Sequence, residues 1–249
     1  MKQKKIKVYK DYKFSYIHTH NEVLNDNLVI MLHGFCMDKD EKGNYVKLAD
    51  ILLDNGYDSI RLDFLGLGDS NGDSIELTIG LCLKEIDLII NDYKYKNISI
   101  IGTSFGGGIG VLYSNIRKIK KLILISPLID YQRNVIKPEN HFCREFLGEE
   151  AIKKIKENGY STFGVTDFKF DMRLFEDVKK YNPVDIIKDT NSKVLIIHGD
   201  KDLLVPFKQS VDISNLNDNI KLDKIEYGSH CFYDNYDNII EKTLLFLKQ

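Results

Sequence analysis

Hydrophobic and polar residues follow two patterns in turn along this chain of 249 residues. Short unbroken apolar runs, rich in β-branched residues, are typical of strands buried on both faces. Apolar residues three or four apart are typical of helices that cover a sheet. The runs that we expect to form buried strands are 28–32, 59–64, 98–101, 121–126 and 194–197. Their alternation with helical patterns predicts an α/β protein with a mostly parallel sheet covered on both faces.

The helical patterns lie between these runs. They fall at 45–53, at 75–93, directly after Ser104, and at the end of the chain beyond a further strand near 220–227. Residues 6–18 instead alternate apolar and polar on either side of Lys10-Asp11-Tyr12. That alternation predicts a hairpin.

Residues 127–191 break the alternation of strands and helices. They are richer in charge and contain helical pieces at 149–157 and 171–181. A connection of this length with structure of its own indicates an insertion. We therefore expect an α/β core made of 1–126 and 192–249, with 127–191 as an inserted cap.

A candidate nucleophile stands where an apolar run turns into a helix, in Gly102-Thr103-Ser104-Phe105-Gly106. So sharp a turn strains the backbone of Ser104 and pushes its side chain outward. Gly102 and Gly106 flank it where a Cβ would collide with the opposite limb of the turn. The amide of Phe105, the first of the helix, is aimed beside the hydroxyl, where it suits an oxyanion. A glycine-rich turn that merely contains a serine is the alternative, and the flanking strand and helix favour a nucleophile.

A nucleophilic serine needs a histidine to take its proton and a carboxylate to orient that histidine. His230, in a loop before the last helix, is the candidate base. Asp200 and Asp202 are the candidate acids, with Asp63 and Asp69 as more distant possibilities. Asp200 lies nearer the strand and suits a turn cap, whereas Asp202 precedes an apolar stretch that can bury it, so we favour Asp202. The order Ser104, Asp202, His230 is the one that accompanies Gly-x-Ser-x-Gly.

A second turn, His33-Gly34-Phe35, follows the apolar run 28–32. Gly34 allows the backbone to approach a substrate, and the amide of Phe35 is a candidate second oxyanion donor. We expect His33 to hold this loop by a hydrogen bond.

Outside 127–191 the whole chain resembles the α/β-hydrolase superfamily. The matching motifs are His33-Gly34-Phe35, Arg61-Leu62-Asp63-Phe64 with Gly66-x-Gly68-Asp69-Ser70, Gly102-x-Ser104-x-Gly106-Gly107, His198-Gly199-x-x-Asp202 with Val205-Pro206, and Gly228-x-His230. The resemblance implies the α/β-hydrolase fold and makes Asp202, four residues after His198, the acid. The stretch His230-Cys231-Phe232-Tyr233-Asp234 is similar to bacterial cinnamoyl (feruloyl) esterases. Those enzymes commonly have His before the nucleophile and Gln after it, where this chain has Thr103 and Phe105.

The resemblance and the candidate residues together predict a serine hydrolase that cleaves a small-molecule ester through an acyl-serine, with an aryl or medium-length acyl group. No metal and no organic cofactor are required. The aromatic residues of the insertion either shape the acyl pocket or form the core of the cap; they are Tyr131, Phe142, Phe146, Tyr160, Phe163, Phe168, Phe170 and Phe175. A thioesterase or small-peptide hydrolase would use the same residues, and a non-catalytic binding protein on the same fold is a further alternative.

Charge and composition narrow the class of partner. A net charge of -2 gives no reason to expect nucleic acid, and no apolar run is long enough for a membrane span or a secretory signal. Four scattered cysteines suit a reducing cytoplasm. His18 and His20 have no third metal ligand nearby. We expect a cytoplasmic protein that can form a homodimer.

Overall fold

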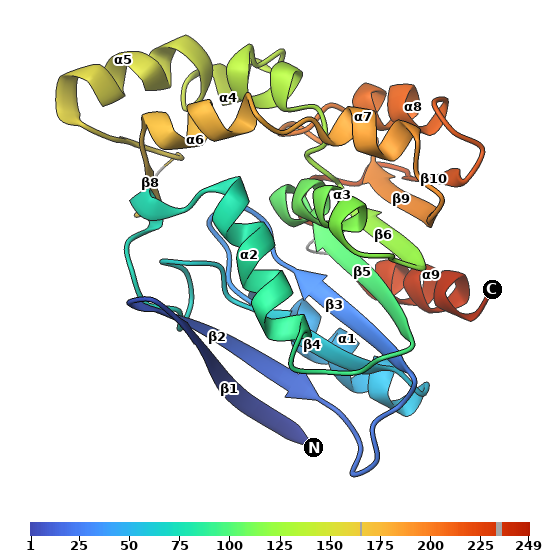
Figure 1. The fold of residues 1–249 in the computed structure, drawn as a ribbon. Helices are drawn as coiled ribbons and strands as arrows, with labels where there is room; N and C mark the ends of the chain where they lie inside the picture. The colour runs from blue at the N-terminus through green and yellow to red at the C-terminus, as the bar shows by residue number, and fades with distance from the viewer. Residues whose placement is uncertain (165, 233–235) are drawn as a thin grey trace.

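One large sheet runs through the structure, a computed structural model that describes residues 1–164, 166–232 and 236–249 (Figure 1). Its strands are β1 (Lys2–Tyr9), β2 (Tyr12–Thr19), β3 (Asn27–Leu32), β4 (Asp58–Leu62), β5 (Asn97–Thr103), β6 (Lys121–Ile125), β9 (Lys193–Gly199) and β10 (Ile220–Ile225). In the described residues they lie in the order β1-β2-β4-β3-β5-β6-β9-β10. Strands β1 and β2 pair antiparallel, as do β2 and β4, and the remaining neighbours are parallel. The predicted mostly parallel sheet is confirmed.

Helices cover both faces of this sheet, as predicted. One face packs on α1 (Asn44–Asp54) and α9 (Tyr236–Lys248), and the other on α2 (Ile79–Ile90), α3 (Phe105–Ile116) and α8 (Phe207–Ser214). Successive residues of a strand point to opposite faces. In β3, Ile30 therefore lies in the core beneath α2 and α3, while Met31 lies in the core beneath α1 and α9. Burial on both faces explains why the strand sequences are apolar without interruption.

The helix predicted over 75–93 is two elements. A short 3₁₀ turn, η2 (Ser74–Glu76), precedes α2, and residues between them are extended. Thr78 caps α2, because its side chain accepts a hydrogen bond from the backbone N–H of Leu81 at 3.2 Å. A side-chain oxygen at this position satisfies a helix N–H that would otherwise lack a partner, so the helix starts there.

The segment 127–191 forms mostly short elements. They are η3 (Gln132–Ile136), α4 (His141–Arg144), α5 (Gly148–Asn158), β7 (Ser161–Thr162), β8 (Lys169–Phe170), α6 (Met172–Val178) and α7 (Pro183–Lys188). Helices α4, α5 and α6 form a layer above the sheet in Figure 1. The predicted helix 171–181 is α6, and Asn182-Pro183 starts α7, which packs against α3.

Hydrogen bonds join the segment 127–191 to the first turn of α2 and to the 3₁₀ turn η2 before it. The N–H of Gly80, in the first turn of α2, donates to Asp177 of α6 at 2.9 Å. The hydroxyl of Ser74 donates to the carbonyl of Lys169 at 3.1 Å and accepts from its N–H at 2.9 Å. The segment is therefore docked on the core by polar as well as apolar contacts.

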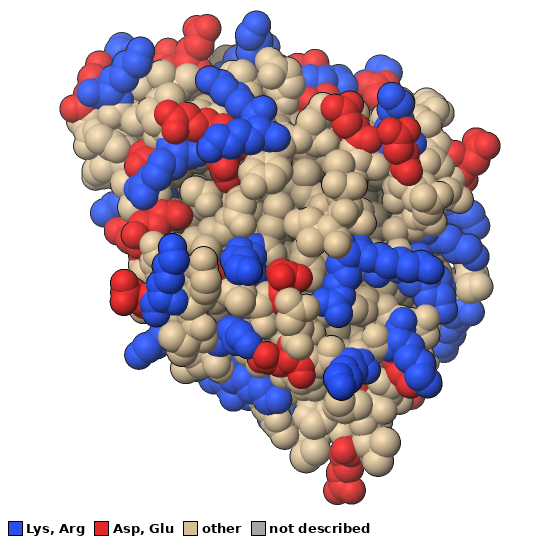
Figure 2. Space-filling model, viewed as in Figure 1, with Lys and Arg blue, Asp and Glu red and all other residues tan. Residues whose placement is uncertain are grey.

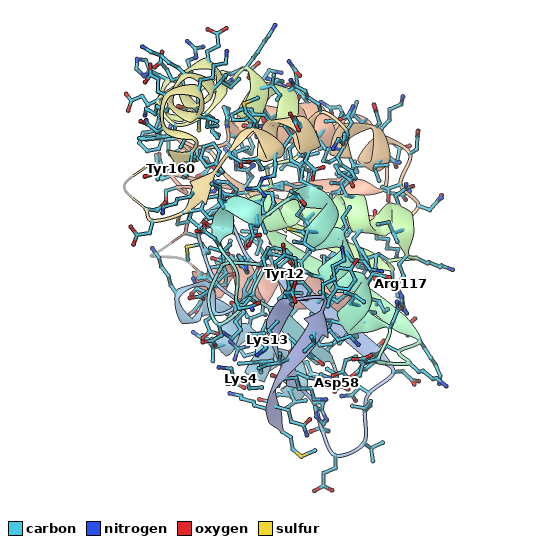
Figure 3. All side chains as sticks on the ribbon, turned by 60° about the vertical axis from the view of Figure 1, so that its left-hand side comes forward. Lys4, Tyr12, Lys13, Asp58, Arg117 and Tyr160 are labelled. Carbon is cyan, nitrogen blue, oxygen red and sulfur yellow. The ribbon has the colours of Figure 1, made fainter. Side chains whose placement is uncertain are left out.

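Charged side chains of both signs are interspersed on the face shown in Figure 2. Figure 3 labels Lys4 of β1 and Lys13 of β2 on the antiparallel hairpin. Within the described ranges, none of the helices combines the length and the apolar character that crossing a membrane requires.

Candidate active site

The turn from β5 into α3 places Ser104 at a strained position. Its backbone has φ 50° and ψ -112°, a conformation that is rare for a residue with a side chain. Its N–H donates to the carbonyl of Ile125 in the neighbouring strand at 2.9 Å, which anchors the turn to the sheet. The Ser104 side chain lines a cavity at this point. This is the geometry that the Gly-x-Ser-x-Gly motif predicts.

Glycines flank Ser104 because two backbone segments approach closely there. A Cβ on Gly102 would lie 2.4 Å from the carbonyl oxygen of Gly106, on the opposite limb of the turn as expected. A Cβ on Gly106 would instead lie 2.2 Å from the carbonyl oxygen of Leu32, at the end of β3. The constraint on Gly106 is therefore the neighbouring strand, which the sequence around the serine does not reveal.

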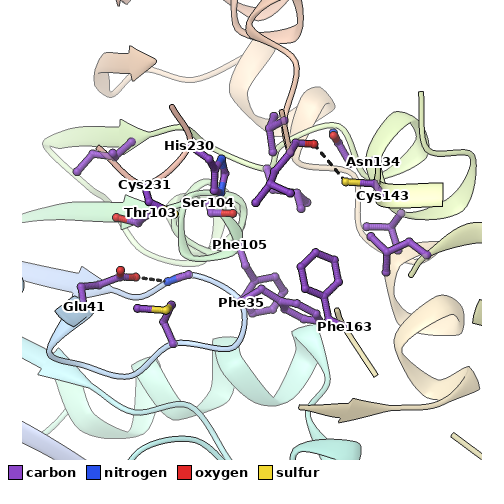
Figure 4. Close-up of a pocket in the computed structure, with 18 of the residues that line it drawn as sticks. Phe35, Glu41, Thr103, Ser104, Phe105, Asn134, Cys143, Phe163, His230 and Cys231 are labelled. Carbon is purple, nitrogen blue, oxygen red and sulfur yellow. Dashed lines mark hydrogen bonds between the residues drawn. The ribbon is translucent and has the colours of Figure 1, made fainter. Parts of the chain in front are cut away.

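His230 and Asp202 are brought together from segments 28 residues apart. Nδ1 of His230 lies 2.7 Å from Oδ2 of Asp202. His230 also lines the cavity that Ser104 lines, and Figure 4 shows the two side chains side by side. Asp200 has another partner, since its Oδ1 accepts the backbone N–H of Tyr227 at 2.8 Å. Of the two aspartates, Asp202 is the one that can orient His230.

Asp202 is buried and held by four hydrogen bonds. Its Oδ1 accepts the N–H groups of Leu204 at 2.8 Å and Val205 at 2.9 Å, and its Oδ2 also faces Nε2 of His198 at 2.9 Å. Burial by itself raises the pKa of Asp202, but the hydrogen bonds from His198 and His230 outweigh it and lower that pKa. The carboxylate is therefore charged and fixed in orientation at neutral pH.

His198 is a residue to which the sequence assigned no role. It is fully buried, and its Nδ1 lies 2.6 Å from the hydroxyl of Ser210. The sequence feature that could have indicated a role for His198 is the motif His198-Gly199-x-x-Asp202, in which the histidine lies only four residues before the acid. Only the folded loop brings Nε2 onto the carboxylate.

Two backbone N–H groups remain unengaged beside Ser104. In the described part of the chain, no hydrogen bond uses the N–H of Phe35 or of Phe105, although both residues line the cavity. His33 holds the first of these turns as expected, because its Nε2 accepts the N–H of Phe64 at 3.1 Å. Its Nδ1 is therefore the donor to the carbonyl of Gly34 at 2.8 Å. Burial lowers the pKa of His33, which agrees with a neutral imidazole.

The cavity around Ser104 has a volume of about 150 Å³ and two different sides. Figure 4 shows Phe35 and Phe163 on one side of Ser104, and Glu41, Thr103 and Cys231 on the other. The apolar side is completed by residues of the segment 127–191; they are Tyr131, Val135, Cys143, Leu147, Leu174 and Val178. An acyl group bound to Ser104 would meet apolar walls there.

Most of the aromatic residues of 127–191 lie in one of the two expected places, the cavity wall or the interior of this segment, and two of them lie in neither. Tyr131 and Phe163 line the cavity. Phe168 is buried, with its ring 4.2 Å from that of Phe35. Phe142 and Tyr160 are exposed. The rings of the remaining three residues contact other aromatic rings of this segment: Phe146 contacts Phe163, and Phe170 contacts Phe175.

The remaining candidates for chemistry are two histidines, four cysteines and the residues that follow Phe232. His18 and His20 stack with ring centroids 4.3 Å apart, and the described residues contain no group of three or more potential ligands that could hold a metal ion. All four cysteines are free. Tyr233 and Asp234, which contributed to the resemblance with cinnamoyl esterases, lie outside the described residues.

The parallel sheet, the sharp turn at Ser104 and the loop that carries His230 define the α/β-hydrolase fold. The chain belongs to the serine aminopeptidase S33 family, whose profile matches residues 25–182. Ser104 and the His33-Gly34-Phe35 turn lie inside that match, whereas Asp202 and His230 follow it.

Individual proteins resemble parts or all of the chain. The mitochondrial palmitoyl-protein thioesterase ABHD10 of Homo sapiens is 25% identical over 164 residues, which are 64% of this chain and 52% of that protein. The chain thus spans about half the length of the human protein. The protein of Mycoplasma genitalium that is named "Putative esterase/lipase 2" is 26% identical over 244 residues, 86% of this chain and 88% of that protein.

Solved structures agree with the fold. Est1E from Butyrivibrio proteoclasticus with ferulic acid bound has a TM-score of 0.81 at 22% identity and covers 98% of this chain and 97% of its own. Mouse α/β-hydrolase domain-containing protein 10 has a TM-score of 0.76 at 19% identity, and the match covers 99% of this chain and 98% of the mouse chain. At these identities the likeness establishes the fold.

Proposed function

We propose that this protein is a serine hydrolase that cleaves carboxylic esters through an acyl-serine intermediate. The observation that carries the proposal is one cavity lined by the Ser104 hydroxyl, by His230 paired with Asp202, and by two unengaged N–H groups. A nucleophile, its base, the orienting acid and an oxyanion site are the parts that acyl transfer needs.

In the first half of the reaction, His230 takes the proton of Ser104 as Oγ attacks the carbonyl carbon of the ester. The carbonyl oxygen becomes an oxyanion, and the N–H groups of Phe35 and Phe105 stabilise it. Asp202 holds His230 in the required tautomer and stabilises the imidazolium. The tetrahedral intermediate then collapses, His230 gives its proton to the leaving alcohol, and the acyl group stays on Ser104.

In the second half, a water molecule takes the place of the alcohol. His230 removes its proton, the resulting hydroxide attacks the acyl carbon, and Ser104 regains a proton as the acid leaves. Atoms and charge balance without any group beyond these side chains and water.

The acyl group belongs, in this proposal, on the apolar side of the cavity. Residues 127–191 act as the cap, and 1–126 with 192–249 as the hydrolase core. Phe163 and Tyr131 of the cap offer flat walls to an aryl acyl group, which gains from ring packing. Esters of aryl or medium-length acids are therefore the proposed substrates.

A thioesterase is the second candidate, because the human relative at 25% identity is named a palmitoyl-protein thioesterase. Attack on a thioester uses the same serine, histidine and oxyanion donors. The two candidates differ in the leaving group and not in the residues involved.

A fluorophosphonate probe tests the proposal directly. We expect covalent labelling of the wild-type protein at Ser104 and none of the Ser104→Ala variant. A panel of p-nitrophenyl, hydroxycinnamoyl and acyl-coenzyme A substrates then separates the two candidates. A folded wild-type protein that neither labels nor turns over any of these substrates would disprove the hydrolase assignment.

A further inference from the structure

Glu41 lies in the wall of the cavity, although the proposed mechanism does not use it. Its side chain is 9% exposed, and its Oε1 accepts the backbone N–H of Gly34 at 2.5 Å, the bond drawn as a dashed line in Figure 4. Carboxylates are rarely buried unless a partner compensates for the lost water. We therefore expect the buried carboxyl group of Glu41, which lies beside the candidate nucleophile, to have a functional role.

The backbone around Glu41 is held in an unfavourable conformation to keep the carboxyl there. Glu41 has φ 45° and Lys42 has φ 55°, and a side chain at such an angle costs free energy. The two residues that precede Glu41 are anchored to β4 and to the residue directly after it. Nζ of Lys39 lies 2.7 Å from Oδ2 of Asp63, and Arg61 is ion-paired with Asp40. Strain that persists in a loop so firmly anchored is typical of functional sites.

Gly34 stands between the carboxyl group and the nucleophile. A Cβ on Gly34 would lie 3.4 Å from Oε1 of Glu41 and 3.6 Å from Cβ of Ser104. Its carbonyl accepts hydrogen bonds from Nδ1 of His33 at 2.8 Å and from the N–H of Met37 at 3.2 Å. Its N–H is taken by Glu41, so the glycine is held from both ends.

Holding Gly34 from both ends sets the direction of the next amide. The carbonyl of Gly34 and the N–H of Phe35 belong to the same peptide plane, and they point in opposite directions. Glycine is the residue with the greatest backbone freedom, so without fixed hydrogen bonds this plane would sample other orientations. Oxyanion donors act by being aimed before the charge develops.

We propose that Glu41 is a positioning residue for the oxyanion site. It holds the His33–Gly34 peptide through the Gly34 N–H, while the hydrogen bonds to the Gly34 carbonyl hold the next peptide. With Gly34 fixed on both sides, the Phe35 N–H points at the reacting carbonyl oxygen. This role rests on the proposed function. Glu41 touches neither the substrate nor the reacting atoms in it. Its effect passes through the peptide and appears only when the oxyanion forms.

The charge on Glu41 gives this role a pH dependence. Burial raises the pKa of Glu41 to about 7, the Gly34 N–H opposes that rise, Asp38 adds to it, and His230 and Lys42 oppose it. The buried hydroxyl groups of Tyr45 and Tyr236 also face this region. A hydrogen bond to an ionised carboxylate is roughly twice as strong as one to a neutral group. Glu41 should therefore hold Gly34 more firmly as the pH rises through about 7.

The test compares Glu41→Ala and Glu41→Gln with a matched control, Glu85→Gln. Glu85 is a second buried glutamate, with no exposed surface, whose Oε1 accepts the backbone N–H of Leu65 at 3.2 Å, and it lies outside the cavity lining. We would measure kcat and KM for p-nitrophenyl acetate, and inhibition by an aryl trifluoromethyl ketone, which forms a tetrahedral oxyanion on the serine.

For Glu41→Ala we expect kcat to fall on the order of 10- to 100-fold, with KM changed by less than about threefold. The ketone should bind more weakly by the same factor as kcat falls. Glu41→Gln retains an acceptor and should lose less than about tenfold, and Glu85→Gln should keep kcat within about twofold. A Glu41→Ala protein with wild-type kcat and ketone affinity would overturn the inference, as would an equal loss in Glu85→Gln.

If Glu41→Ala does not fold, the pH profile of Glu41→Gln decides. The ratio of wild-type to variant kcat should rise between pH 6 and 8, and a constant ratio would overturn the inference. The wild-type measurement separates the two levels of the proposal. An inactive wild-type protein would refute the hydrolase assignment, whereas an active one with unaffected Glu41 variants would refute only this role.

Discussion

His198 and His230 approach the same oxygen of Asp202, Oδ2, at 2.9 and 2.7 Å. His198 is fully buried, whereas His230 faces the cavity. His198 therefore helps to hold the carboxylate in place, and His230 is the group that the carboxylate orients.

This arrangement predicts that His198→Ala weakens both stability and turnover. Asp202 and Ser210 would each lose a buried hydrogen-bond partner, at a cost of about 1–3 kcal/mol in the free energy of unfolding. We expect kcat for p-nitrophenyl acetate to fall about tenfold or more, because the carboxylate can rotate away from His230. Urea denaturation and steady-state kinetics on the same protein check both effects. Unchanged kcat in a destabilised protein would restrict His198 to a structural role.

Ser104→Ala should abolish ester turnover and leave the fold intact. The expected loss in kcat is on the order of 10³-fold or more, with the remainder due to the oxyanion donors. Circular dichroism and initial rates measure the two outcomes. Near wild-type activity in the folded variant would show that Ser104 is not the nucleophile.

The two aspartates provide a matched pair of substitutions. Asp202→Asn should reduce kcat far more than Asp200→Asn, because Asp202 contacts His230 and Asp200 instead accepts the N–H of Tyr227. The comparison is made at constant pH on folded proteins. The opposite ranking would assign the acid to Asp200.

Phe163 should select the acyl group. Its ring lines the cavity, with its centroid 5.5 Å from that of Phe35. Loss of one good aromatic contact costs about 0.5–1.5 kcal/mol, or about 2- to 13-fold in kcat/KM. We expect Phe163→Ala to lose that factor on hydroxycinnamoyl esters and little on acetate esters. Tyr160→Ala is the control, because Tyr160 is exposed and labelled at the outer edge of the upper layer in Figure 3. Equal losses on both esters would argue against a role in selection.

Glu41 should make stability depend on pH in a defined direction. Its folded pKa is raised from 4.5 to about 7, so the folded state holds this proton more tightly than the unfolded state. The contribution is fully present below the unfolded pKa and is lost as the pH rises through about 7, with an upper limit of about 3 kcal/mol. Glu41→Gln has no such proton. The difference in unfolding free energy between variant and wild type should therefore shift in favour of the variant between pH 4.5 and 8. A difference that does not change with pH would contradict the raised pKa.

The sequence alone determined the fold class and the candidate residues of the site. Uninterrupted apolar runs such as 28–32 can only be buried on both faces, and Gly102-x-Ser104-x-Gly106 is a local motif whose geometry depends on residues adjacent in the chain. The residues adjacent to His33 and to Asp202 in the chain likewise indicated that these two residues belong to the candidate site. Each of these signals lies within a few positions of the residue it describes.

Only the tertiary structure decided which distant groups meet. Gly106 is required by the carbonyl of Leu32, His198 holds Asp202 across a folded loop, and Glu41 reaches Gly34 through a strained turn. The break before α2 also escaped the periodic pattern, because the apolar positions continue through Leu77 and a single capping threonine starts the helix. Such contacts depend on the packing of whole strands and loops, and hydrophobic spacing records which face a residue occupies but not what it touches there.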